Sequence, residues 1–86
     1  MNILNLNRGA SFKVKRVTLP RETGKRLADM GFTSGTEGVI VRSALLGDPI
    51  QIKILGYNIS IRKSEAAGII VEIPPEEKNP PRGEDI

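Results

Sequence analysis

The sequence predicts a mainly β fold, in which five short strands form a small, partly open barrel with one short helix and one helical turn. Three observations support this prediction. Ile50, Ile52 and Ile54 alternate with polar residues, which is the period of a half-buried strand. Glycine and proline interrupt the chain at short intervals, as a series of tight turns requires. The one segment with helical spacing, residues 23–30, is about two turns long and needs a sheet to pack on.

The first half of the chain is expected to hold one strand and the helix. A strand is predicted at residues 12–17; apolar and basic side chains alternate over residues 12–15, so Phe12 and Val14 are predicted to share its inner face. Thr23 is expected to be the N-cap of the helix. Gly31 is expected to follow the helix in a left-handed conformation, because glycine adopts it without steric cost.

The second half is expected to be β structure with one helical interruption. Four further strands are predicted, at residues 38–44, 50–54, 58–62 and 69–73. Tight turns are expected at residues 47–49 and at Gly56. Residues 63–67 are interpreted as a single helical turn that Ser64 caps and Gly68 closes.

The composition divides the chain into one domain, residues 1–73, and a Pro-rich acidic tail, residues 74–86. The domain holds eleven Lys or Arg and six Asp or Glu, a net charge of +5, whereas the tail has a net charge of −2. The tail has no apolar periodicity and is expected to be extended and flexible. The basic domain suits an acidic protein surface, nucleic acid or anionic lipid.

The residue types that are missing exclude several chemistries. The chain has no His and no Cys, so a catalytic triad, a thiolate nucleophile and a typical zinc site are excluded. We predict no catalytic residue and no cofactor. The carboxylates that could be combined into a metal site lack ligand spacing, and we reject such a site: Asp29, Glu37, Asp48 and Glu65. Without a secretory signal or a long apolar run, the protein is expected to be cytoplasmic.

Leu45 and Leu46 are the first candidate contact residues. They are adjacent just before the predicted turn at residues 47–49, and a strand cannot bury neighbouring side chains on one face. Two interpretations remain open. The leucines are either an exposed apolar contact site or a cover over the open end of the barrel. Asp48 is interpreted as a turn residue whose carboxylate accepts backbone N–H groups.

Arg62 and Lys63 are a second candidate, as a site for an anion or an acidic partner. By residue type alone, an exposed strand end followed by a capped helical turn is favoured. Arg26 is expected to face water on the helix, where it is free for a contact.

Four short motifs follow one another in a fixed order: Leu27-Ala28-Asp29-Met30-Gly31, Gly35, Gly47-Asp48-Pro49-Ile50 and Ile61-Arg62-Lys63-Ser64-Glu65-Ala66. Their order and spacing resemble the FeoA family from about residue 4 to residue 73, with Ile61 where leucine is usual. The resemblance implies an SH3-like barrel. It also implies a cytosolic adaptor or regulator that binds the cytosolic part of the membrane GTPase that imports ferrous iron, without chemistry of its own.

On that basis six residues are predicted to contact the transporter. Three are apolar contacts and three are cations that steer the approach to an acidic surface: Leu45, Leu46 and Pro49, and Arg26, Arg62 and Lys63. The alternative function is a small basic nucleic-acid-binding barrel. Such surfaces place aromatic residues among the cations, whereas here only Tyr57 is available, at a turn. An open barrel edge also allows weak self-association.

Overall fold

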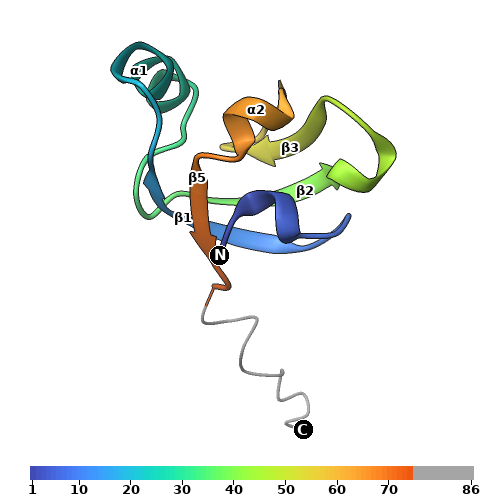
Figure 1. Cartoon of the computed structure of the whole chain (residues 1–86). Helices are drawn as coiled ribbons and strands as arrows, with labels where there is room; N and C mark the ends of the chain where they lie inside the picture. Colours follow the sequence, from blue (N-terminus) through green and yellow to red (C-terminus); the bar gives the residue numbers. More distant parts are fainter. Residues whose placement is uncertain (75–86) are drawn as a thin grey trace, which may run out of the picture.

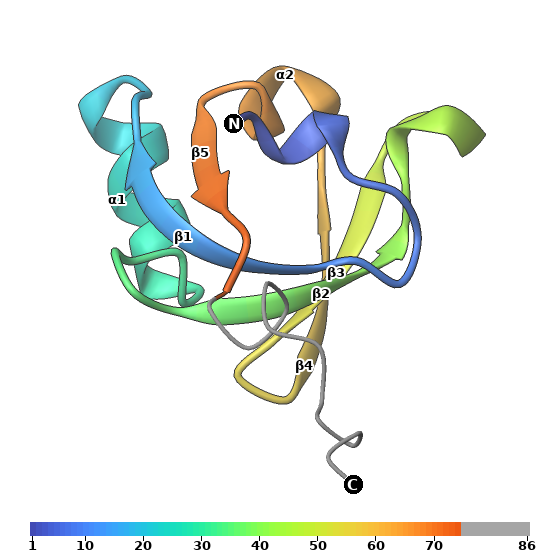
Figure 2. The ribbon, with the colours of Figure 1, turned by 90° about the horizontal axis from the view of Figure 1, so that it is seen from below.

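A computed structural model describes residues 1–74, which form one antiparallel sheet flanked by short helices (Figure 1). The strands are β1 (Ser11–Val17), β2 (Glu37–Arg42), β3 (Ile50–Ile54), β4 (Tyr57–Ile61) and β5 (Ile69–Glu72). Their order across the sheet is β4-β3-β2-β1-β5, and Figure 2 shows the sheet curled into an open barrel. The predicted mainly β fold with five strands is confirmed. The predicted flexible tail lies outside the described residues, apart from Pro74.

The helical segments are short and lie between the strands. They are α1 (Arg21–Asp29), α2 (Lys63–Ala66) and two 3-10 turns, η1 (Ile3–Asn5) and η2 (Ala44–Leu46). Within residues 1–74, no helix is long and apolar enough to cross a membrane. The strand expected at residues 38–44 ends earlier, at Arg42, because residues 44–46 turn into η2.

The predicted start of α1 is wrong. The helix begins at Arg21, directly after Pro20, and Thr23 lies inside its first turn. Proline already has a backbone φ close to the helical value, and the Pro20 C=O accepts the N–H of Gly24 at 2.8 Å. The helix therefore starts from backbone geometry, without a side-chain cap.

The predicted end of α1 is confirmed. Gly31 follows the helix with φ +112°, in the left-handed region that favours glycine. The Gly31 N–H donates to the Ala28 C=O at 3.0 Å, and the Phe32 N–H donates to the Leu27 C=O at 2.9 Å. This pair of bonds is a Schellman motif, which satisfies the last carbonyl groups of the helix.

The core lies inside the barrel and consists of aliphatic side chains and two phenylalanines. Its most buried members are Ile3, Phe12, Val14, Leu27, Phe32, Ile40, Ile50, Ile52, Ile54, Ile61, Ala66, Ile69 and Val71. The alternation predicted for β3 is confirmed, because its three isoleucines are buried while Lys53 is exposed. The inward position predicted for Phe12 and Val14 is also confirmed.

Candidate functional site

Leu45 and Leu46 lie in η2, the turn that joins β2 to β3, and both are exposed to solvent. Their exposed fractions are 84% and 64%. Of the two interpretations left open by the sequence, the cover over the barrel end is therefore wrong. Two adjacent leucines with this exposure make a small apolar surface on the turn.

The backbone around η2 is held by several hydrogen bonds. A guanidinium N–H of Arg42 donates to the Leu46 C=O at 3.0 Å, and the Gly47 N–H donates to the Ala44 C=O at 3.1 Å. Gly47, in the turn predicted at residues 47–49, has φ +117°, a conformation that glycine adopts without steric cost. Leu46 is thus exposed on a turn whose backbone conformation is fixed by hydrogen bonds.

Asp48 connects this turn to α2. One of its carboxylate oxygens accepts the N–H of Lys63 at 2.9 Å. The first N–H groups of a helix need an acceptor from outside the helix, and the N-cap residue, Arg62, has a side chain that can only donate. The predicted cap by Ser64 is therefore wrong. Asp48 does accept a backbone N–H, as expected, but from α2 and not from its own turn.

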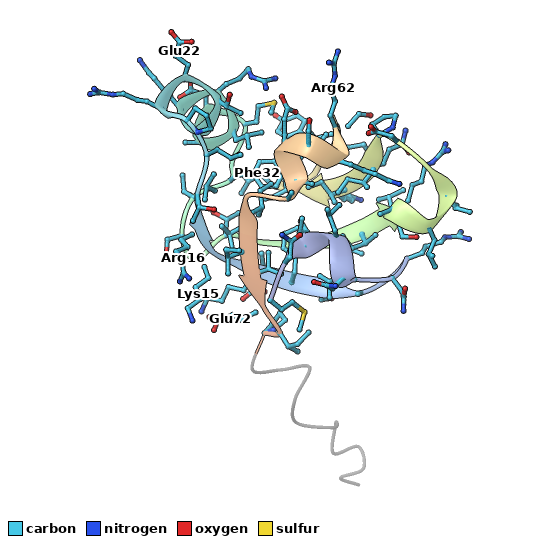
Figure 3. All side chains as sticks on the ribbon, viewed as in Figure 1. Lys15, Arg16, Glu22, Phe32, Arg62 and Glu72 are labelled. Carbon is cyan, nitrogen blue, oxygen red and sulfur yellow. The ribbon has the colours of Figure 1, made fainter. Side chains whose placement is uncertain are left out.

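A hollow of about 330 Å³ opens beside the turn, lined by Asp48, Pro49 and Arg62. Arg62 is exposed, and Figure 3 shows its side chain directed away from α2 into solvent. Pro49 and Arg62, which were predicted as contact residues on separate grounds, therefore lie at one surface. Lys63, the next residue, donates its backbone N–H to Asp48, which also lines this hollow.

Arg26 lies on α1 and pairs with Glu65 of α2. Its side chain is 55% exposed, so it faces water as expected, but its guanidinium group already has a carboxylate partner. An exposed ion pair of this kind contributes about 1 kcal/mol or less to stability. The ion pair joins Arg26 to α2, and Arg26 does not line the hollow beside the leucine turn.

Two contacts were not predicted from the sequence. Arg42 donates a hydrogen bond to the backbone carbonyl of Leu46, and Glu65 of α2 forms an ion pair with Arg26 of α1. In residues 1–74, no three Asp or Glu side chains come together as metal ligands.

Replacing Asp48 by alanine is expected to destabilise the fold by about 1 kcal/mol, the usual effect of losing a capping oxygen. The reason is that the Lys63 N–H loses its acceptor. Urea unfolding of the variant measures this difference. Ser64→Ala is the matched control and should change stability by less than about 0.5 kcal/mol. Equal losses in the two variants would contradict the capping role of Asp48.

Comparison with known proteins places this chain in a family. The FeoA domain family model matches residues 1–73. A curated relative from Porphyromonas gingivalis, an Fe(2+) transport protein A/Fe(2+) transporter FeoB fusion protein, is 36% identical over 73 residues. The match covers 85% of this chain but 9% of the relative, so the chain corresponds to a small part of that protein.

Two solved structures have the same fold and similar sequences. The FeoA protein of Chlorobium tepidum is 34% identical with a TM-score of 0.78, and the match covers 85% of this chain and 70% of that one. The FeoA of Stenotrophomonas maltophilia, solved with zinc, is 26% identical with a TM-score of 0.75, covering 84% and 89%. It is described as a prokaryotic SH3-domain protein and a candidate activating factor of ferrous-iron transport.

These likenesses confirm the predicted SH3-like barrel. They also confirm the resemblance carried by the four sequence motifs, since the family match spans the same part of the chain. The chain belongs to the FeoA family, whose members are components of ferrous-iron transport systems.

Proposed function

We propose that this protein is a non-enzymatic adaptor or regulator of bacterial ferrous-iron import. It binds the cytosolic part of the membrane GTPase transporter, and it works in the cytoplasm. The observation that carries the proposal is the exposed pair Leu45 and Leu46 on a hydrogen-bonded turn. The fusion protein of Porphyromonas gingivalis supports it, because one chain there carries both transport protein A and the transporter FeoB.

The leucine pair would supply the affinity of this contact. Removing one exposed leucine side chain from water contributes about 1.5–3 kcal/mol. Interfaces concentrate their binding energy in a few such anchors that enter pockets of the partner. Pro49 follows Leu46 by three residues and lines the neighbouring hollow, so it would extend the apolar contact.

The cations near the hollow would supply orientation and speed of association. Arg62 is exposed there, and Lys63 follows it in α2. Charges at the rim of an interface mainly raise the association rate and add less to affinity. Arg26 would join them from α1 by exchanging its Glu65 partner for a carboxylate of the transporter. An acidic surface around an apolar pocket is therefore the expected binding site.

Calorimetric titration of the protein into the purified cytosolic part of the transporter, at low and moderate salt, tests this function. Saturable binding that weakens by only a small factor at moderate salt is expected, because the leucine anchors are not screened. Absence of binding at both salt concentrations would contradict the proposal. The alternative function, nucleic-acid binding, predicts instead a steep loss of affinity for an oligonucleotide as salt rises.

A further inference from the structure

β4 lies at one edge of the sheet, where its outer side has no partner among residues 1–74. Figure 2 shows β4 beside β3, its one neighbour in the sheet. The opposite edge is treated differently. There β5 pairs with the start of the chain: the Val71 N–H donates to the Met1 C=O at 2.7 Å, and Asn2 forms a bridge with Ile70. The chain thus covers one edge of its sheet and leaves the other available.

The register shows which groups of β4 are available. β4 follows β3 through a two-residue turn, Leu55 and Gly56, that closes on the pair Ile54 and Tyr57. Hydrogen-bonded and non-bonded pairs alternate along an antiparallel ladder. Because residues 57, 59 and 61 bond to β3, Asn58 and Ser60 direct their N–H and C=O groups outward. The side chains of Asn58 and Ser60 are also exposed.

This edge lacks the usual protection against pairing with another strand. Exposed edges are normally blocked by charged residues, proline or a bulge. The residues of β4 are Tyr57, Asn58, Ile59, Ser60 and Ile61, and none is charged, whereas every other strand carries at least one charged side chain. The register of β4 with β3 is also regular throughout, while the ladders β1–β5 and β2–β3 contain shifts.

We propose that a second copy of this chain pairs with this edge, β4 against β4, antiparallel about a two-fold axis through Ile59. In that register Asn58 of each copy faces Ser60 of the other, so the outward backbone groups form two doubly bonded pairs. Ile59 faces Ile59. It packs partly buried against the core on the edge strand, and the contact would complete its burial.

A second copy fits this edge better than a charged peptide does. Residues 1–74 have an excess of Lys and Arg, so two copies repel each other least where they meet through an uncharged segment. β4 is that segment, and its pairing is self-complementary: amide with hydroxyl, isoleucine with isoleucine. The same register places the ring of Tyr57, which is 71% exposed, beside Ile61 of the second copy.

The contact is small, so the dimer should be weak. Five paired residues bury less than a standard interface, and we expect dimers to form between about 10 µM and about 1 mM. Sedimentation velocity of the full chain over this range should show a rising average mass. A monomer at all these concentrations would overturn the proposal.

Two substitutions of Ser60 locate the contact. Ser60→Pro removes an outward N–H without removing a bond to β3, and Ser60→Lys places a charge on the edge. Both variants should remain monomeric at the highest concentration. Ser34→Lys, at an exposed loop position, is the charge-matched control and should dimerise like the natural chain. Dimerisation of both Ser60 variants would overturn the proposed edge.

A cross-link gives an independent readout. The chain has no cysteine, so a disulfide in a single-cysteine variant must join two copies. Ile59→Cys puts two thiols opposite each other at the two-fold axis, in a non-bonded pair with close Cβ atoms. Under mild oxidation it should form dimers at least about tenfold faster than Ser34→Cys. Equal rates for the two variants would contradict pairing about Ile59.

Discussion

Replacing Leu45 and Leu46 together by alanine is expected to weaken binding to the transporter's cytosolic part by at least about 30-fold, which corresponds to the loss of one interface anchor. The two side chains are among the most exposed apolar groups of the described residues, so their removal changes the contact surface and little of the core. The free energy of unfolding should change by less than about 0.5 kcal/mol. Calorimetry with the same transporter fragment measures the affinity.

Leu55→Asn is the matched control for the leucine pair. Leu55 is 65% exposed, but it lies in the turn between β3 and β4, away from η2. Its φ of +54° suits asparagine better than leucine, so the variant should fold at least as well as the natural chain. Its affinity for the transporter should be unchanged. Loss of binding in this control, or full binding by the double alanine variant, would contradict the assignment of the contact to η2.

Replacing Gly38 by alanine is expected to destabilise the protein by about 3 kcal/mol, the range of core overpacking. Gly38 pairs with Phe12 on one side and Ile54 on the other. A Cβ atom there would lie 2.7 Å from the backbone oxygen of Lys53 and 2.7 Å from the ring of Phe12. Neither atom can move freely, because one belongs to the β3 backbone and the other to a fully buried side chain.

Gly24→Ala is the control for Gly38→Ala, because the same methyl group is added where there is room. A Cβ atom at Gly24 would lie 3.8 Å from the nearest backbone oxygen, that of Leu19. Gly24 is inside α1, so alanine should stabilise the protein by about 0.5–1 kcal/mol through helix propensity. Urea unfolding of both variants measures the two effects. Similar stabilities for Gly38→Ala and the natural chain would show that the sheet has more room than the structure indicates.

The fold could be predicted from local patterns in the sequence. The alternation of isoleucine in β3 and the glycine after α1 each depend on residues that are close together in the sequence. Such local features can be predicted without knowing how the elements pack. The start of α1 was misplaced because threonine is a strong capping residue, yet the helix begins after Pro20, three residues before Thr23.

The candidate site could be predicted only in part. Two adjacent leucines at a turn left exposure and burial over the barrel end both open, and the structure shows that they are exposed. The hydrogen bond from Lys63 to Asp48 and the ion pair of Arg26 with Glu65 could not be predicted, because they join residues 15 and 39 positions apart. Such contacts depend on how the elements pack. For the same reason, the shared hollow of Pro49 and Arg62 became visible only in the folded chain.

Mapping of backbone amide signals by NMR, while the transporter's cytosolic part is added to the labelled protein, tests the central claim most directly. The account predicts that the perturbed signals gather at residues 44–48 and 62–63, which surround η2 and the start of α2. The signals of α1 residues other than Arg26, and those of β4 before Ile61, should change little. Perturbations confined to β4 or to the exposed face of β1, with η2 unaffected, would contradict the account.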